Sequence, residues 1–114
     1  MMRLPSFRYH SPKSVADAAN ILAQEGPDAV LLAGGTDLLP NMKRGQQQPK
    51  TLVSLNRIEA LRQSRNSNGL ILGAGLTLTE LVQNEILREK YPGLSQAASV
   101  IASPLIRNTA TLGG

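Results

Sequence analysis

The chain has 114 residues, of which 41% are hydrophobic and 18% charged, a composition typical of a folded domain rather than a disordered chain. Aromatic residues make up only 3%, cysteine is absent and histidine occurs once, which argues against disulfides, clustered metal ligands and stacking platforms for single-stranded nucleic acid. The net charge of +4 is spread along the sequence, which favours a solvated surface over the alternative, an anion-binding face. No membrane span or secretory signal is expected, so the predicted location is cytoplasmic.

The first part of the sequence predicts a small parallel βαβ arrangement with right-handed crossovers. A helix is expected between the N-cap Ser14 and the stop at Gly26-Pro27, because apolar residues recur along one face. The apolar run at residues 29–33 is bounded by glycine and predicts a strand buried on both faces. The expected elements that follow are a helix over residues 38–44, capped by Thr36 or Asp37, and a strand over residues 51–55.

The pattern changes at residues 56–60, where we expect an internal boundary. Segments 61–65 and 70–73 flank the turn Asn66-Ser67-Asn68-Gly69, which predicts an antiparallel hairpin. Thr77 and Thr79 are both candidate caps, and Glu80 completes a capping-box pattern with Thr77, which predicts a helix over residues 78–84. The remaining expected helical segments, separated by a break at Pro92-Gly93 and ended by Ser103-Pro104, cover residues 85–90 and 94–101.

Two glycine-containing segments are candidate anion sites. In Ala33-Gly34-Gly35-Thr36-Asp37, residues without a side chain lie between a strand and a helix N-terminus, where backbone N–H groups and the helix dipole favour a phosphate. The segment Thr109-Ala110-Thr111-Leu112-Gly113-Gly114 offers hydroxyl groups and open backbone donors. Taken alone, each is also explained by an ordinary turn, and the first fits neither the Walker A loop nor the dinucleotide fingerprint.

Three other positions have a structural and a functional interpretation. His10 has no second titratable group near it in the sequence beyond Tyr9, so we expect a structural histidine rather than a cofactor contact. Asp37 stands at a helix start and is expected to cap the helix rather than to act as a base. For Met42-Lys43-Arg44, a solvated last helical turn and a contact with a phosphate or partner subunit remain equally open.

The two glycine loops, with Ile101-Ala102-Ser103-Pro104-Leu105-Ile106-Arg107-Asn108 between them, resemble the flavoprotein subunit of the molybdenum hydroxylases. This group contains the carbon monoxide dehydrogenase medium subunits and the FAD domain of xanthine dehydrogenase. Residues 33–37 match its first FAD loop, Ala-Gly-Gly-x-Ser/Asp, and residues 111–114 match its second, Thr-Ile/Leu-Gly-Gly. The resemblance covers the whole chain, and residues 34–44 are most similar to the β subunit of 4-hydroxybenzoyl-CoA reductase.

The resemblance implies an α+β protein with an α/β N-terminal lobe, the two-lobed FAD-binding fold of the vanillyl-alcohol-oxidase type. Residues 1–56 would form the small βαβ lobe and residues 57–114 the first part of the second lobe. The fold would be incomplete at the C-terminus, because the terminal Gly113-Gly114 is typical of a cut within the motif. No catalytic side chain and no metal ligand is expected on this chain. The implied FAD-binding residues are Leu31, Leu32, Ala33, Gly34, Gly35, Thr36, Asp37 and Leu38 around the pyrophosphate and ribose, Ile101 near the flavin, and Thr111, Leu112, Gly113 and Gly114 over the phosphates.

The resemblance also implies an electron-transfer subunit of a molybdenum-cofactor oxidoreductase, which passes electrons between an iron–sulfur subunit and an external carrier. The expected partners are the molybdopterin large subunit and the two-iron iron–sulfur small subunit, which would carry the molybdopterin and the clusters. Nucleic acid is not an expected partner. Two alternatives to this hypothesis remain. The first is a non-redox nucleotide- or phosphate-binding regulatory module, and the second is an inactive truncated fragment that self-associates through uncovered apolar surface.

Overall fold

The computed structural model describes residues 3–114, and the chain divides into two compact units, the first ending at Ala60 and the second beginning at Leu61. This division lies close to the predicted boundary between residues 56 and 57, and the assignment of the two units as FAD-binding lobes stays a prediction. Over residues 3–114, no helix is long and apolar enough to cross a membrane.

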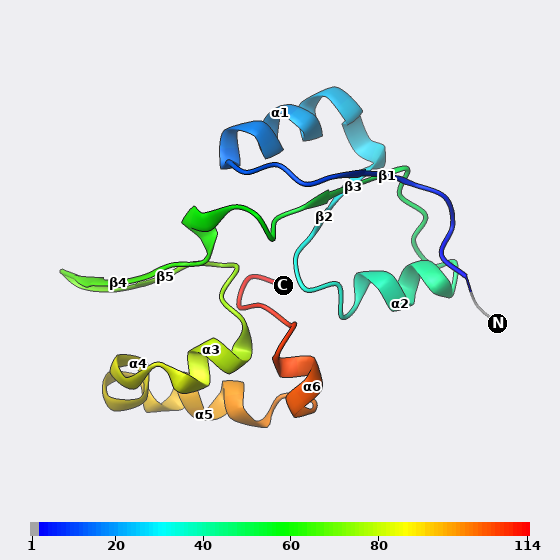
Figure 1. Cartoon of the computed structure of the whole chain (residues 1–114). Coiled ribbons are helices and arrows are strands. Elements are labelled where there is room, and N and C mark those ends of the chain that lie inside the picture. Colours follow the sequence, from blue (N-terminus) through cyan, green and yellow to red (C-terminus); the bar gives the residue numbers. More distant parts are fainter. Residues whose placement is uncertain (1–2) are drawn as a thin grey trace. The chain divides into compact units, whose positions relative to one another are not determined.

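Unit 1 is built on a three-stranded parallel sheet in the order β1-β3-β2 (Figure 1). The central strand β3 (Thr51–Ser54) pairs on one side with β1 (Arg8–His10) and on the other with β2 (Ala29–Leu32). The parallel βαβ arrangement predicted from the sequence is therefore present. Strand β1 was not predicted, because three residues are too few to show a period and their conformation depends on pairing with β3.

Burial differs between the centre and the edge of this sheet. All four residues of β3 are buried, and Leu52 and Val53 are completely inaccessible. Strand β2 lies at the edge of the sheet and is only partly buried, with Leu31 44% exposed. The prediction that the run 29–33 is buried on both faces is wrong, because an apolar run alone does not distinguish an edge strand from a central one.

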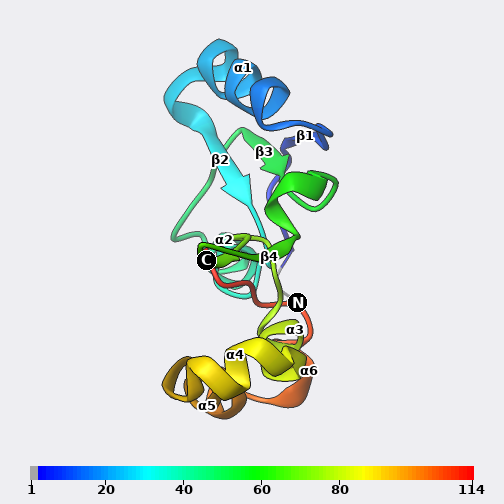
Figure 2. The ribbon, with the colours of Figure 1, turned by 90° about the vertical axis from the view of Figure 1, so that its left-hand side faces the viewer.

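Helices α1 (Val15–Glu25) and α2 (Leu38–Lys43) lie on opposite sides of the sheet (Figures 1 and 2). As predicted, the Ser14 hydroxyl caps α1 by accepting a hydrogen bond from the Asp17 N–H at 3.1 Å. The helix ends at Gly26, whose φ is +74°, and the 3-10 turn η1 (Gly26–Asp28) leads into β2. Asp37 occupies the N-cap position of α2, but its side chain makes no capping hydrogen bond, so the predicted cap is wrong in that respect.

Unit 2 begins with an antiparallel hairpin, as predicted. Strands β4 (Ser64–Ser67) and β5 (Gly69–Leu72) pair so that Ser67 is opposite Gly69, which narrows the predicted four-residue turn to Asn68. The short 3-10 helix η2 (Glu59–Leu61) precedes the hairpin and spans the division between the units.

Four short helices follow, α3 (Leu78–Gln83), α4 (Glu85–Lys90), α5 (Pro92–Val100) and α6 (Pro104–Arg107). The Thr77 hydroxyl caps α3 by accepting from the Glu80 N–H at 3.1 Å, which confirms the predicted start. The predicted break between the helical segments is present, but it lies at Tyr91, and Pro92-Gly93 opens α5, since proline is tolerated in a first turn. The predicted stop at Ser103-Pro104 is also the start of α6, which sequence analysis missed.

The core of unit 2 lies where these helices meet the hairpin. Its buried residues come from the segment before α3 and from α3, α4 and α5, and partly buried side chains of β5 pack against them. The buried members are Leu76, Leu78, Leu81, Leu87 and Ala98, and the partly buried ones are Leu70, Leu72, Val82 and Ala110.

Candidate functional site

The first glycine loop, residues 33–37, follows the carboxyl end of β2 and leads directly into α2. Ligands of parallel α/β sheets bind beyond the carboxyl ends of the strands, so this loop occupies the usual position for a binding site. Its residues are half-buried up to Thr36, whereas Leu31 before it and Asp37 at its end are exposed. Leu32 and Leu38, the other predicted site residues here, are half-buried.

Gly35 is fixed as glycine by both conformation and space. Its φ of +76° lies in the left-handed region that side chains disfavour. A Cβ on Gly35 would lie 3.0 Å from the Cδ1 of Leu32 and 3.1 Å from the Cδ1 of Leu39. The loop therefore turns tightly against two leucine side chains.

Backbone donors of this first loop remain open. The Gly35 carbonyl accepts from the Leu39 N–H at 3.1 Å, and the Asp37 carbonyl accepts from the Asn41 N–H at 3.0 Å, which starts α2. Within the described part of unit 1, the N–H groups of residues 34–38 donate no backbone hydrogen bond. Such first-turn amides require a side chain, water or ligand as acceptor.

The second glycine loop, residues 111–114, differs in this respect. Thr111 forms an antiparallel bridge with Thr77, and the N–H groups of Leu112 and Gly113 donate to the carbonyls of Leu76 and Ala74 at 2.9 and 2.8 Å. The expectation of open backbone donors in residues 109–114 is therefore wrong for these two amides, because the segment pairs with the chain that precedes α3. It is also wrong for the amides of Thr109 and Ala110, which donate to the Ile106 carbonyl, and for that of Gly114, which donates to the Thr111 carbonyl. The same hydrogen bonds fix the end of the chain within unit 2.

The glycines of this second loop also have structural roles. A Cβ on Gly113 would lie 2.7 Å from the Cβ of Ala74, so its absence allows the paired segments to approach each other. Gly114 has φ +120°, and its carbonyl accepts a hydrogen bond from the Thr111 hydroxyl at 2.7 Å. The groups left for a ligand are mainly carbonyl oxygens and the exposed surface of Leu112 to Gly114.

Ile101, predicted to lie near the flavin, is 47% exposed at the end of α5. Its carbonyl accepts a hydrogen bond from Nη1 of Arg107 at 2.9 Å, and the same nitrogen lies 3.4 Å from the carbonyl oxygen of Ala102. Ala102 has φ +52°. From the sequence, Arg107 was identified only as part of the family pattern. Its contact with this segment was not predicted, because nothing in an Ala-Ser-Pro sequence indicates a left-handed alanine.

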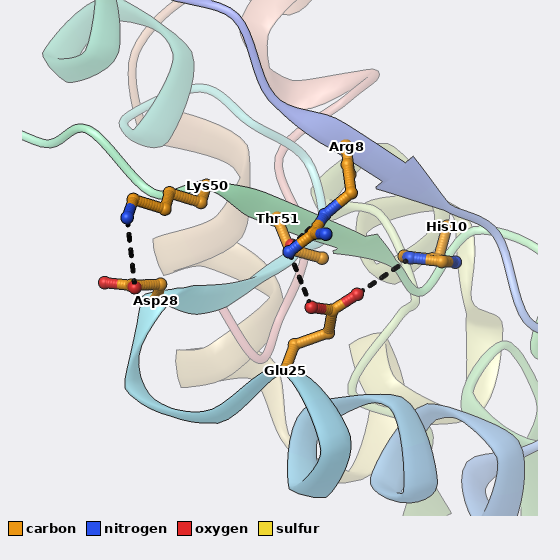
Figure 3. Close-up of polar contacts among 6 residues, drawn as sticks. All are labelled: Arg8, His10, Glu25, Asp28, Lys50 and Thr51. Carbon is orange, nitrogen blue, oxygen red and sulfur yellow. Dashed lines mark hydrogen bonds and ion pairs between the residues drawn. The ribbon is translucent and has the colours of Figure 1, made fainter.

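His10 belongs to a polar cluster between β1 and the end of α1 (Figure 3). The Arg8 guanidinium donates to the Glu25 carboxylate at 2.7 Å, and Nε2 of His10 lies 3.5 Å from the other oxygen of Glu25. This arrangement ties a strand to a helix and agrees with a structural histidine, although the carboxylate beside it comes from a distant part of the sequence. Among residues 3–114, no group of three or more potential ligands could hold a metal ion.

The predicted site residues are distributed over both units. Residues 31–38 belong to unit 1, and residues 101 and 111–114 belong to unit 2. Met42 is buried in the core, so neither interpretation of the turn 42–44 applies to it. Lys43 and Arg44 at the end of α2 are exposed and form no ion pair within residues 3–114, so both interpretations remain open for them.

Comparison with known proteins gives matches over nearly the whole chain. The family described as the FAD binding domain in molybdopterin dehydrogenase matches residues 5–114. The carbon monoxide dehydrogenase medium chain of Hydrogenophaga pseudoflava is 44% identical over 111 residues, covering 96% of this chain and 39% of that protein. The xanthine dehydrogenase FAD-binding subunit of Escherichia coli O157:H7 is 39% identical over 108 residues, covering 93% of this chain and 37% of the relative.

Solved structures give the same result. Carbon monoxide dehydrogenase from Hydrogenophaga pseudoflava, in a form lacking the Mo-pyranopterin moiety of the molybdenum cofactor, matches with a TM-score of 0.96 and 44% identity. The match covers 99% of this chain and 40% of the other. The chain thus spans about two fifths of the length of these relatives.

Proposed function

This chain belongs to the family of FAD-binding domains in molybdopterin dehydrogenases, and we propose that it binds FAD within an electron-transferring subunit of a molybdenum-cofactor oxidoreductase. The family resemblance, the α+β FAD-binding fold and FAD as the family's cofactor are confirmed by the comparisons. The finer similarity to the 4-hydroxybenzoyl-CoA reductase β subunit stays a prediction. The non-redox regulatory module is not favoured by these matches.

The first glycine loop is the observation that supports the site most strongly. The amides of residues 34–38 donate no backbone hydrogen bond within the described part of unit 1 and follow the carboxyl end of a parallel strand, and Gly35 cannot carry a side chain without meeting Leu32 and Leu39. This is the donor set that a pyrophosphate requires. The exposed Asp37 carboxylate makes no capping hydrogen bond. As a charged acceptor it suits a ribose hydroxyl, which would donate to it, rather than a phosphate.

In unit 2 we propose a more limited role for the second loop. Its amides at Leu112, Gly113 and Gly114 are occupied, so contacts with FAD would come from its exposed surface and from the Ile101 segment. When bound, FAD supplies the redox chemistry, and the chain supplies binding, orientation and tuning of the potential. No side chain on this chain is proposed as an acid or base.

The electron route and the partners belong to the same proposal. The relatives' names describe them as medium chains or subunits of dehydrogenases, which supports an assembly with a molybdopterin large subunit and a two-iron iron–sulfur small subunit. In that assembly the flavin would pass electrons between the iron–sulfur subunit and an external carrier. A cytoplasmic location is part of the proposal, and no contact with nucleic acid is included in it.

Titration of FAD into the full 114-residue chain, followed by flavin fluorescence, tests the proposal. We expect saturable, noncovalent binding that acid precipitation reverses, since the chain contains no cysteine for a thioether and the Nε2 atom of its one histidine, His10, is buried and lies 3.5 Å from the Glu25 carboxylate. Absence of saturable binding up to about 1 mM FAD, or flavin that stays with the acid precipitate, would overturn it. Riboflavin serves as the control, because it lacks the pyrophosphate that the first loop is proposed to bind.

A further inference from the structure

The link between α5 and α6 holds an unusual backbone conformation. Ala102 has φ +52° and is the one non-glycine residue with positive φ among residues 3–114. L-amino acids with a Cβ rarely adopt this region, because the side chain approaches the following carbonyl. Such a residue persists only where its surroundings hold it in place.

Packing does not hold this segment. Ile101 is 47% exposed, and Ala102 and Ser103 are also exposed. What holds it is Arg107, whose Nη1 atom lies 2.9 Å from the carbonyl oxygen of Ile101 and 3.4 Å from that of Ala102. A guanidinium is suited to this role, since its planar donors keep a fixed geometry.

Arg107 is itself placed by short helix α6. The Ser103 hydroxyl accepts from the Ile106 N–H at 3.3 Å and so starts the helix directly after the strained residue. At its other end, the Thr79 hydroxyl donates to the Asn108 side chain at 2.6 Å, which ties α6 to α3. Arg107 and Asn108 also line an open groove of about 230 Å³ beside Thr79 and Ser99. Helix α6 therefore connects an exposed strained segment to α3.

We infer that Arg107 is a positioning residue for FAD, which holds residues 101–103 in the strained conformation so that this segment forms part of the cofactor-binding surface. The inference rests on the proposed function. The strained conformation of this exposed segment does not contribute to the core. It is nevertheless maintained by two hydrogen bonds from the charged guanidinium of Arg107. Strained residues of this kind cluster at ligand sites, and this one is held by a charged side chain rather than by core packing.

The test compares three variants of the full 114-residue chain. Arg107→Met removes the guanidinium and keeps the length of the side chain, Arg107→Lys keeps the charge, and Arg88→Met is the matched control in the exposed last turn of α4. We measure FAD affinity by fluorescence, the absorption spectrum of the bound flavin at saturation, and the melting temperature of each chain without FAD.

We expect Arg107→Met to weaken FAD binding by about tenfold or more and to change the bound-flavin spectrum. Arg107→Lys should recover part of the affinity, and Arg88→Met should match the parent. A parent-like affinity and spectrum in Arg107→Met would overturn the inference while leaving the proposed function standing. Failure of the parent chain to bind FAD would instead overturn the proposed function.

A double variant keeps the test decisive if Arg107→Met does not fold. Adding Ala102→Gly permits a positive φ without the hydrogen bonds of Arg107. It should therefore restore the melting temperature but leave residues 101–103 free to move. We expect the refolded double variant to remain weak in FAD binding with an altered flavin spectrum. Parent-like binding and spectrum in the double variant would show that Arg107 serves the fold alone.

Discussion

The two glycine pairs of this chain have the same sequence and different structural roles. Gly34-Gly35 follows a strand of a parallel sheet and leaves the amides of residues 34–38 without backbone partners within the described part of unit 1. Gly113-Gly114 lies beside the segment before α3, and the Gly113 amide donates to the Ala74 carbonyl. A glycine pair thus indicates that another group can approach the backbone closely. Whether that group is a ligand or another segment of the protein depends on which segment lies beside the pair.

The largest effect on stability is expected at the second loop. In Gly113→Val, the new Cβ would lie 2.7 Å from the Cβ of Ala74 and 3.1 Å from its carbonyl oxygen, so backbone has to move. We expect a loss of about 3 kcal/mol in the free energy of unfolding, measured by urea titration of the chain without FAD. A loss below about 1 kcal/mol would show that this loop does not depend on close pairing.

At the first loop, the larger effect should be on the ligand. Gly35→Val directs a branched side chain against Leu32 and Leu39 at a positive φ, so the first loop has to change its conformation. This change would displace the amides that are proposed to bind pyrophosphate, and we expect FAD affinity to fall by at least about tenfold. Gly26→Val is the matched control, because Gly26 has nearly the same φ, +74° against +76°, and a Cβ there meets nothing within 4 Å.

The control should lose folding stability through backbone strain and keep its FAD affinity. Equal FAD binding by Gly35→Val and the parent would mean that Gly35 is a turn residue only, and the first loop would lose its place in the proposed site.

The helix starts next to the two loops give a smaller, matched pair of effects. The Thr77 hydroxyl caps α3 beside the second loop, so Thr77→Ala should lower the free energy of unfolding by about 1 kcal/mol. Asp37 makes no capping bond at α2, so Asp37→Ala should change it by less than about 0.5 kcal/mol. Thermal unfolding of both variants without FAD measures the difference, and equal losses would contradict the assignment of the two caps.

Local signals in the sequence predicted much of this fold. Ser14 and Thr77 mark helix starts through their own side chains, and the Asn68-Gly69 pair marks the hairpin, because these interactions involve residues three or fewer positions apart. The first glycine loop was identifiable for the same reason, since a strand, a turn and a helix are consecutive there.

The features that sequence analysis missed depend on distant partners. Strand β1 forms only because β3 lies beside it, and the amides of the second loop are occupied by a segment more than thirty residues earlier. The left-handed conformation of Ala102 depends on Arg107, at the end of α6, which donates hydrogen bonds to the carbonyls of Ile101 and Ala102. In each case the residue types allowed both outcomes, and the tertiary pairing decided between them.

Amide hydrogen exchange of the 114-residue chain, with and without FAD, tests the difference between the loops most directly. The account predicts that the Leu112 and Gly113 amides exchange slowly without FAD and change little when it is added, since they already donate to Leu76 and Ala74. The amides of residues 34–38 should exchange rapidly without FAD and become protected with it. Protection that appears at residues 112–113 on FAD addition while residues 34–38 remain unchanged would contradict the account.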